Sequence, residues 1–310
     1  MKIINIDKPK GWTSYDVVHF IKRQFNEKKV GHLGTLDPLA TGVLPVFLGK
    51  ATRLIPLFNE SDKTYRAVCK LGESTDTYDA EGTVTNCGDI SSLNPLDIIK
   101  TVNSFHGNQI QKTPAFSAAK VKGVPAYKLA RQGLKVPDKT RSVIFHELVV
   151  ESIELPYVQI WIHCSKGTYI RSLANDLGQV LNVGAYLTSL ERLACGKWFN
   201  SENSVTVEKL KMFDNENEVP WISPLEVLDH LYTVVSNNWM VSLIKHGRTV
   251  ELTNVPYGDD NGVKAEKTDF VEGKSDKQAK VIDTCQNLVA IGRIIWENGG
   301  SYFKPTKVFV

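Results

Sequence analysis

Residues 31–42 read GHLGTLDPLATG, and this stretch is the most informative part of the sequence. Three glycines and a proline in twelve positions predict a structured loop that brings backbone close to a ligand. Its one acid is Asp37, between Leu36 and Pro38. Asp-Pro is a common turn dipeptide, but a carboxylate held in a rigid loop is also a candidate nucleophile toward a sugar carbon. No second carboxylate lies nearby in sequence to serve as an acid, so an isomerisation fits better than glycoside hydrolysis.

The elements expected around this loop combine strands and helices without strict alternation. A short strand is expected at 2–6 and a helix from Ser14, as N-cap, to about Asn26, because apolar residues recur at helical spacing. Further strands are expected at 64–71, 82–85, 142–153 and 158–164, and further helices at 93–105 and 168–181. This pattern does not resemble repeated parallel βαβ units.

The composition changes after residue 210. Residues 211–224 are polar, acidic and proline-bearing, as linkers are, and 225–231 carry a short helical pattern. Beyond Asn238 we expect a small β unit, with a helix at 239–246 and strands at 249–252, 288–296 and 306–310. Residues 256–280 hold six acids and five lysines with almost no aliphatic residues, which predicts a mobile insertion.

Length and composition limit the class of protein. With 310 residues and 42% hydrophobic residues, the chain fits one large domain plus a small one. No apolar stretch is long enough for a membrane span and no signal peptide is visible, so we expect a cytoplasmic protein. Five scattered cysteines indicate reduced core residues, and the histidines show no metal-ligand spacing. Residues 42–51 superficially resemble a P-loop but lack its glycine spacing and its final Ser or Thr.

Positive charge is concentrated in one segment. The whole chain carries only +3, but residues 100–142 hold seven lysines and two arginines against one acid, Asp138, which gives +8. Aromatic residues such as Phe116 and Tyr127 lie among these cations. Such a segment suits a polyanion with exposed bases, although a solvated lysine-rich loop has the same composition.

Several motifs, in order, closely resemble those of the bacterial tRNA pseudouridine synthase B (TruB) family. The first two are DKPKGWTS at 7–14 and the loop at 31–42. The others are KTYRA at 63–67, LGESTDTYDAEG at 71–82, TPAFSAAK at 113–120, AYKLARQG at 126–133 and CSKGTYIRSLA at 164–174. Together they span most of the first 200 residues. The end of the chain, from Leu243 to Pro305, resembles the small PUA β-barrel that closes bacterial members.

The resemblance implies an enzyme that isomerises uridine 55 in the T-loop of tRNA to pseudouridine by base flipping, without a cofactor or metal. The essential aspartate of the family falls on Asp37. Matches to substrate-binding positions fall on five residues: His32, Tyr65, Tyr169, Arg171 and Leu190. Of these, Tyr65 matches a residue that stacks on the flipped base, His32 one that fills the vacated space, and Arg171 one that pairs with the aspartate. The resemblance leaves open whether the carboxylate attacks the sugar, attacks the base or assists elimination to a glycal.

The resemblance also implies a fold and its partners. We expect an α+β catalytic domain at 1–235, with a mixed, largely antiparallel sheet, flanking helices and a central RNA-binding cleft. A basic RNA-clamping insertion is expected at about 106–142, and a PUA-like domain at 236–310. Backbone phosphates of the tRNA T-arm are expected to contact Lys120, Lys122, Lys128 and Arg131. No membrane and no obligatory protein partner are expected, and the protein is expected to be a monomer.

Two departures and two alternatives accompany this interpretation. Leu33 stands where the family more often has threonine, and the insertion at 256–280 is longer than a compact barrel needs. The first alternative is an RNA-binding tRNA folding chaperone in which Asp37 is structural. The second is the catalytic subunit of a guide-RNA-dependent pseudouridylation particle, although the chain lacks the extended basic tails of those relatives.

Overall fold

The structure is a computed structural model that describes residues 1–117, 120–121, 123–134, 136–252, 257–258, 277–297 and 300–310. Its contacts divide the chain into two compact units. One unit comprises residues 4–47 and 54–220, and the other comprises residues 1–3, 48–53 and 221–310. The domain boundary expected between residues 235 and 236 stays a prediction.

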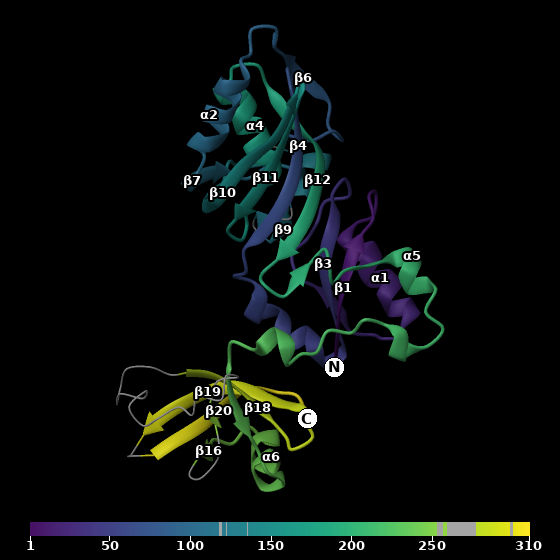
Figure 1. Ribbon diagram of the computed structural model, residues 1–310, viewed down its shortest axis with the longest axis vertical. Coiled ribbons are helices and arrows are strands. Elements are labelled where there is room, and N and C mark those ends of the chain that lie inside the picture. Colours follow the sequence, from purple (N-terminus) through teal and green to yellow (C-terminus); the bar gives the residue numbers. More distant parts are fainter. Residues whose placement is uncertain (118–119, 122, 135, 253–256, 259–276, 298–299) are drawn as a thin grey trace. The chain divides into compact units, whose positions relative to one another are not determined.

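A ten-stranded sheet forms the centre of the larger unit (Figure 1). The main path runs in the order β14-β1-β3-β12-β4-β11-β10-β7, while β13 pairs with β12 and β2 with β3. The bounds are β1 Lys2–Lys8, β2 Val30–His32, β3 Thr41–Leu48, β4 Lys63–Leu71, β7 Gly107–Lys112, β10 Thr140–Glu154, β11 Tyr157–Cys164, β12 Ala185–Cys195, β13 Phe199–Asn200 and β14 Val205–Thr206. The β1–β14 and β3–β12 pairs are parallel, whereas β4, β7, β10 and β11 pair antiparallel with their neighbours. The expected mixed, largely antiparallel α+β fold is therefore confirmed.

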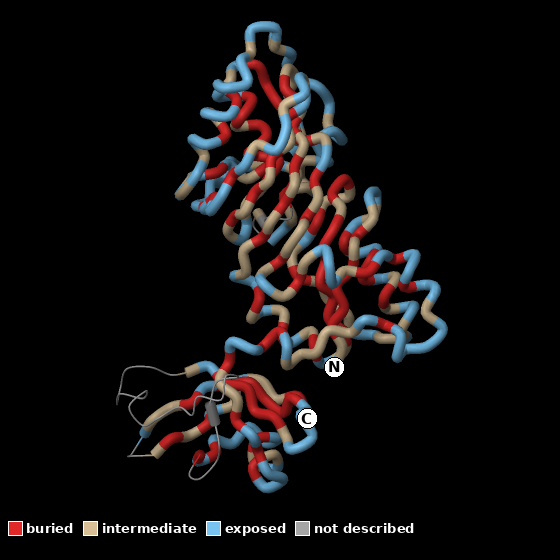
Figure 2. The backbone as a smooth tube through the Cα atoms, viewed as in Figure 1, coloured by how far each residue is buried: buried red, intermediate tan, exposed pale blue. Residues whose placement is uncertain are grey.

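Alternation of buried and partly exposed side chains explains the central strands. In β4 every second residue from Lys63 to Leu71 is buried, including Tyr65, Ala67 and Cys69. A strand places successive side chains on opposite faces, so one face of β4 is fully covered. Figure 2 shows the buried residues following the strands through the middle of this unit.

The helices of the larger unit are short and amphipathic. They are α1 Ser14–Gln24, α2 Pro95–Ser104, α3 Ala126–Arg131, α4 Ile170–Val180 and α5 Val207–Lys211, with a 3-10 segment η2 at Glu216–Glu218. Another 3-10 segment, η1 Gly49–Phe58, has its residues 49–53 in the other unit. Helix α4 packs against β12 and α2 against β10. Two small hairpins pair β5 (Glu73–Thr75) with β6 (Val84–Cys87), and β8 (Lys120–Val121) with β9 (Val124–Pro125).

The N-cap of α1 differs from the expectation. Thr13, not Ser14, caps the helix through a capping box with Asp16. The Ser14 hydroxyl instead accepts from Leu36 N at 2.9 Å and donates to Leu36 O at 3.1 Å. The start of α1 therefore fixes the backbone immediately before Asp37.

Other elements also differ from the sequence-based expectations. The central strands β3 and β12 were not expected, and the expected loop at 31–42 contains the end of β2 and the start of β3. The strand expected at 82–85 is β6 at 84–87, and α4 begins at Ile170 rather than at 168. Three cysteines are buried as expected, but Cys87 and Cys285 are exposed.

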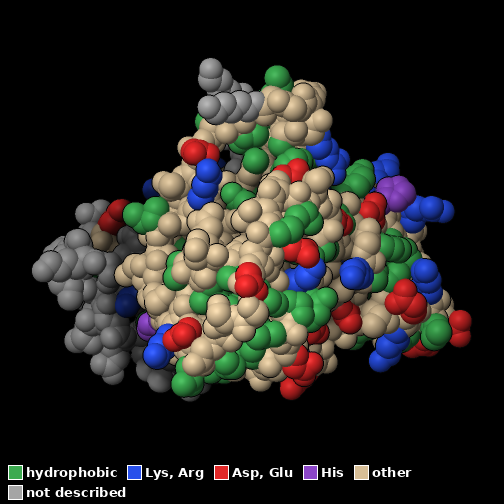
Figure 3. Space-filling view, turned by 90° about the horizontal axis from the view of Figure 1, so that it is seen from above, with side chains coloured by type: hydrophobic (Ala, Val, Ile, Leu, Met, Phe, Trp, Pro, Cys, Tyr) green, Lys and Arg blue, Asp and Glu red, His purple; other side chains and the backbone are tan. Residues whose placement is uncertain are grey.

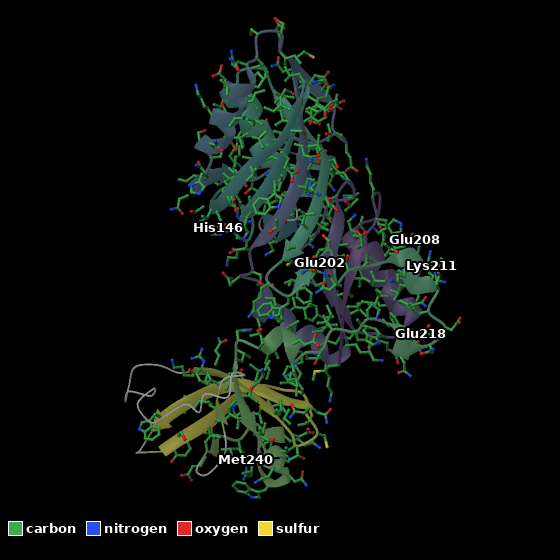
Figure 4. The ribbon with its side chains drawn as sticks, in the orientation of Figure 1. His146, Glu202, Glu208, Lys211, Glu218 and Met240 are labelled. Atoms are coloured by element: carbon green, nitrogen blue, oxygen red, sulfur yellow. The ribbon has the colours of Figure 1, made fainter. Side chains whose placement is uncertain are left out.

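The smaller unit contains a six-stranded sheet in the order β16-β20-β19-β18-β15-β17. Its elements are η3 Glu226–Leu228, β15 Tyr232–Val235, α6 Asn238–Lys245, β16 Val250–Glu251, β17 Tyr257–Gly258, β18 Lys277–Ile282, β19 Leu288–Glu297 and β20 Gly300–Val308. Met240 of α6, labelled in Figure 4, lies in a core cluster with Val234, Ile294 and Phe303. The sheet fits the expected PUA-like domain.

Most of the insertion expected at 256–280 lies outside the described residues. Its last four residues, however, belong to strand β18, where Ala279 and Lys280 are buried. Within the described part of the chain, none of the helices has the length and apolarity needed to cross a membrane. On the face drawn in Figure 3, cationic and acidic side chains are interspersed, in keeping with a net charge of +3.

Candidate active site

A cleft of about 620 Å³ opens in the larger unit and is lined by residues far apart in the sequence. Strands β4 and β12 are neighbours in the sheet, so their ends bring residues of both to one wall. Of the six residues predicted for catalysis and substrate binding, five line this cleft: Asp37, Tyr65, Tyr169, Arg171 and Leu190. The loop at 34–37 and the turn at 165–169 also contribute to the lining.

Asp37 is held by a loop that is anchored on both sides. Lys8 is fully buried, and its Nζ donates to the carbonyls of Trp12 at 2.6 Å, Pro9 at 3.0 Å and Pro38 at 3.4 Å. Gly11 N also donates to Pro38 O at 2.8 Å. These bonds fix the backbone after Asp37 as Ser14 fixes the backbone before it, so the carboxylate is presented by a rigid loop.

A buried arginine joins two carboxylates at the cleft. Arg171 Nε lies 3.0 Å from Asp37 Oδ2, and Nη1 lies 3.2 Å from Asp79 Oδ2. The Nε–H is not directed at an acceptor, so the contact with Asp37 is an ion pair without an aligned hydrogen bond. Arg171 also donates to the carbonyls of Phe116 at 2.9 Å and Thr77 at 3.3 Å. Four contacts thus fix the guanidinium beside Asp37.

Asp37 and Asp79 differ in access to the cleft. The Asp37 side chain is 39% exposed, whereas that of Asp79 is 4% exposed and accepts from Thr77 Oγ1 and Glu81 N. Desolvation raises the pKa of Asp37, and Asp79 raises it further, while the Arg171 charge lowers it. The pair with Arg171 favours the ionised form that a nucleophile requires. Asp37 is therefore the carboxylate of this cluster that a substrate can reach.

Buried side chains of the neighbouring strands β4 and β12 form the wall of the cleft around Tyr65. Tyr65 is 8% exposed, and burial raises the pKa of its phenol. Leu190 is 6% exposed and lies two residues before Arg192, on the same buried face of β12. Arg192 is fully buried, with Nε donating to Val43 O at 2.7 Å and Nη2 to Gly34 O at 3.0 Å. An aromatic ring and a leucine on this wall offer apolar surface to a base.

Tyr169 is held by its backbone, which leaves its ring available. Gln111 Nε2 donates to Tyr169 O at 2.9 Å, and Tyr169 N donates to Gln111 Oε1 at 2.8 Å. The Arg141 guanidinium lies over the Tyr169 ring at 5.8 Å and donates to Gly167 O. Arg141 is exposed and lines the cleft, so cationic charge is present at its accessible side.

Of the remaining predicted residues, His32, Lys128 and Arg131 are described and do not line the cleft. His32 lies on β2, and its Nδ1 is buried without a hydrogen-bond partner. Burial and the nearby Arg192 charge lower the pKa of its imidazole. Lys128 and Arg131 lie on α3, where the Arg131 guanidinium covers the Tyr127 ring at 5.7 Å. Lys122 and the side chain of Lys120 lie outside what the structure describes.

Sequence reasoning missed several charged residues of this site, among them Lys63, Asp79 and Arg192. Lys63 and Asp79 belong to motifs that we quoted but did not assign. Arg192 follows Leu190 at strand spacing, which predicts a shared face and a buried charge once β12 is recognised as a strand. Arginines are rarely buried without a partner. An arginine at an inward-facing strand position was therefore the signal that could have identified Arg192 as a residue of the site. Among the described residues, no group of three or more metal-ligating side chains is placed to hold an ion.

Comparisons with known proteins agree on one family. Residues 22–170 match the model of the N-terminal domain of the TruB family pseudouridylate synthases. The tRNA pseudouridine synthase B of Geobacter sulfurreducens is 42% identical over 264 residues, covering 84% of this chain and 86% of that protein. The enzyme of the same name from Clostridium kluyveri is 37% identical over 311 residues and 99% of both chains.

Solved structures show the same fold in another setting. A crystal structure of a Cbf5-Nop10-Gar1 complex contains a chain with a TM-score of 0.71 and 26% identity to this one. A chain of an H/ACA RNP bound to a substrate RNA containing 2'-deoxyuridine has a TM-score of 0.70 and 26% identity. Each of the two matches covers 100% of this chain and 85% of the matched chain.

Proposed function

The chain belongs to the TruB family of pseudouridylate synthases, and we propose that it is a stand-alone enzyme that isomerises uridine 55 in the T-loop of tRNA. Relatives named tRNA pseudouridine synthase B at 37–42% identity over most of the chain support the activity on tRNA. The observation that carries the site assignment is Asp37, a partly exposed carboxylate in a cleft and 3.0 Å from a buried arginine.

The proposed reaction begins with extrusion of the target nucleotide. A folded T-loop hides the ribose carbon, so the uridine leaves its stack at a cost of a few kcal/mol, which contacts in the cleft offset. Tyr65 and Leu190 supply apolar contact to the base, and Tyr169 bounds the site from the α4 side. Arg171 keeps Asp37 ionised and aimed at the anomeric centre.

The proposed RNA contacts outside the cleft are electrostatic. Lys128 and Arg131, together with Lys120 and Lys122, contact backbone phosphates and position the T-arm without reading its sequence. We further propose that the enzyme acts as a monomer, without a protein partner, in the cytoplasm.

Two other functions have specific support. The Cbf5 likeness favours a guide-RNA-dependent role, and the basic segment favours a tRNA folding chaperone. The guide-dependent role predicts activity only after guide RNA and partner proteins are added. The chaperone role predicts that the chain binds tRNA without forming a chemical product, so the Asp37 carboxylate has no catalytic role.

One incubation separates the proposed function from both alternatives. The purified chain is mixed with an unmodified tRNA transcript, without guide RNA or other protein, and pseudouridine is mapped by nucleotide position. The proposal predicts conversion at position 55 alone. Absence of pseudouridine despite tight binding contradicts it and favours one of the alternatives.

A further inference from the structure

Two cations of the cleft wall converge on one residue of the Asp37 loop. A Cβ atom on Gly34 would lie 3.0 Å from Arg192 Nη1 and 3.9 Å from Lys63 Cε. Gly34 adopts φ +71°, so both its conformation and this close approach require glycine. Lys63 on β4 is 8% exposed and Arg192 on β12 is 1% exposed, and both line the cleft. Positive charge is thus concentrated three residues before Asp37.

Neither cation forms an ion pair with a described residue. Arg192 donates to the carbonyls of Val43, Gly34 and Leu33, and Lys63 Nζ donates to Ser61 O. In the part of the chain that the structure describes, no carboxylate oxygen lies within ion-pair distance of either side chain. Burial lowers the pKa of Lys63, and the neighbouring Arg192 charge lowers it further, while Asp62 acts in the opposite direction. A buried charge without a counterion opposes folding, so stability does not explain the arrangement.

The reaction proposed above creates an anion in this cleft, and the inference rests on that reaction. When the C1′–N1 bond breaks, both of its electrons leave with the base, and the charge spreads over N1, O2 and O4 of uracil. The base then turns, an electron pair from C5 forms the C1′–C5 bond, C5 loses its proton and N1 gains one. Atoms and electrons balance as in any isomerisation. The negative charge therefore exists only between the two neutral nucleosides.

We propose that Lys63 and Arg192 form an electrostatic pair that stabilises the detached uracil anion, with Lys63 facing the base and Arg192 holding the Gly34 loop in place. A fixed positive potential acts on charge that develops in the transition state and leaves the neutral substrate almost unaffected. Lys63 is then a catalytic residue, and Arg192 a positioning residue.

Because Lys63 and Arg192 are buried, the anion that they stabilise is more readily the uracil base than a backbone phosphate. Lys63 lies two residues from Tyr65 on the same buried face of β4. Phosphates of a bound RNA stay close to solvent, where the cleft offers other cations. Arg141 is exposed there, and Lys166, whose side chain is 50% exposed, pairs with Glu60 at the same cleft.

The test compares two leaving bases in the same enzyme. Transcripts carrying uridine or 5-fluorouridine at the target position are reacted with saturating enzyme, and loss of the original nucleoside is followed in a single turnover. Fluorine withdraws electrons and stabilises the base anion by itself. For Lys63→Met we expect a loss of about 100-fold on uridine and less than about tenfold on 5-fluorouridine. Lys63→Arg restores the charge and most of the rate on uridine.

The control is Lys70→Met, which removes a lysine of the same strand that Glu73 neutralises at 2.8 Å. Both substrates should react with it at wild-type rates. The ratio of the two rates within one preparation does not depend on the fraction of folded enzyme, so poor folding of Lys63→Met does not obscure the result.

Three outcomes separate the explanations. An equal loss of Lys63→Met on both substrates overturns the proposal and assigns Lys63 a structural role. The proposal is also overturned if Lys63→Met reacts with both substrates at wild-type rates while the slope of log tRNA affinity against log salt falls by about one. That result would identify Lys63 as a phosphate contact. If the wild-type enzyme consumes neither nucleoside, the proposed function itself fails. If the wild-type enzyme reacts but the loss in Lys63→Met is the same on both substrates, only the inference about Lys63 fails.

Discussion

Two buried arginines of the cleft, Arg171 and Arg192, have opposite electrostatic surroundings. Arg171 lies between two carboxylates, with Asp37 at 3.0 Å and Asp79 at 3.2 Å. Arg192 donates to the backbone carbonyls of Val43, Gly34 and Leu33, and no carboxylate of the described residues pairs with it. One arginine carries a compensated charge and the other an uncompensated one, although both are almost inaccessible to solvent.

The difference teaches what each charge does for a reaction. A compensated guanidinium orients its carboxylate and keeps it ionised, so Arg171 prepares the group that attacks. An uncompensated one keeps a positive potential available for charge that appears later, so the Arg192 side of the cleft suits the leaving base. The following predictions test whether this division of roles holds, beginning with the largest expected effect.

Replacing Arg171 by Met should cause the largest loss. The buried Asp79 carboxylate would lose its ion-pair partner, and the two carboxylates would repel each other. We expect a decrease of about 10³-fold in the single-turnover rate and a loss of about 3–5 kcal/mol in the free energy of unfolding. Both are measured on the same preparation, by pseudouridine formation and by urea unfolding.

Arg66→Met is the matched control for Arg171. Arg66 also pairs with two carboxylates, Glu151 at 2.9 Å and Glu191 at 3.4 Å, but its side chain is 41% exposed. Exposed pairs contribute about 1 kcal/mol or less, so this variant should retain its rate and nearly all its stability. Equal effects of the two substitutions would contradict the role given to burial.

Replacing Arg192 by Lys should have an intermediate effect. The charge is kept, but a single ammonium group does not reach the Val43 and Gly34 carbonyls as the guanidinium fork does. We expect a rate about 10- to 100-fold below wild type with unchanged tRNA affinity, because the Gly34 loop loses its anchor. A rise in KM with an unchanged kcat would show that Arg192 serves binding instead.

Raising the pH should reduce the rate more moderately. Burial lowers the pKa of Lys8 to about 8, so the folded protein loses this proton well below the pH at which the unfolded chain does. The charge beside Pro38 and Asp37 then disappears, and we expect the rate at pH 9 to be about tenfold below that at pH 7. From about pH 8 to 10.5 the unfolded chain binds more protons at this site than the folded protein, so the contribution of Lys8 to stability rises with pH. A rate that falls while urea unfolding shows no matching loss supports this account, and a flat rate profile contradicts it.

Changing the cations outside the cleft should have the smallest effect on chemistry. Lys128→Gln with Arg131→Gln removes two charges of α3, far in sequence from both buried arginines. We expect the slope of log affinity against log salt to fall by about two and the saturated rate to stay within about twofold of wild type. An unchanged slope would remove these residues from the RNA contact surface.

The glycines and proline of 31–42 predicted a structured loop around Asp37, the family resemblance implied the residues around it, and the strand expected at 64–71 is β4. The same reasoning missed β12, whose sequence AYLTSLERLAC is rich in residues that favour helices. Its position between β3 and β4 overrides that preference, because two neighbouring strands satisfy its backbone. Since β12 was missed, so was Arg192. The contacts of Lys8 and Ser14 join segments about 30 and 22 residues apart, and only the folded chain reveals them.

The most direct test of the central assignment is the conversion of uridine 55 in an unmodified tRNA transcript by Asp37→Asn, with Asp97→Asn as control. Asp97 is an exposed acid of α2 that lies 3.8 Å from Lys100. The account predicts that Asp37→Asn binds the transcript as tightly as wild type but forms pseudouridine at a rate lower by about 10⁴-fold or more, while Asp97→Asn is fully active. Pseudouridine formation by Asp37→Asn at the wild-type rate would contradict it.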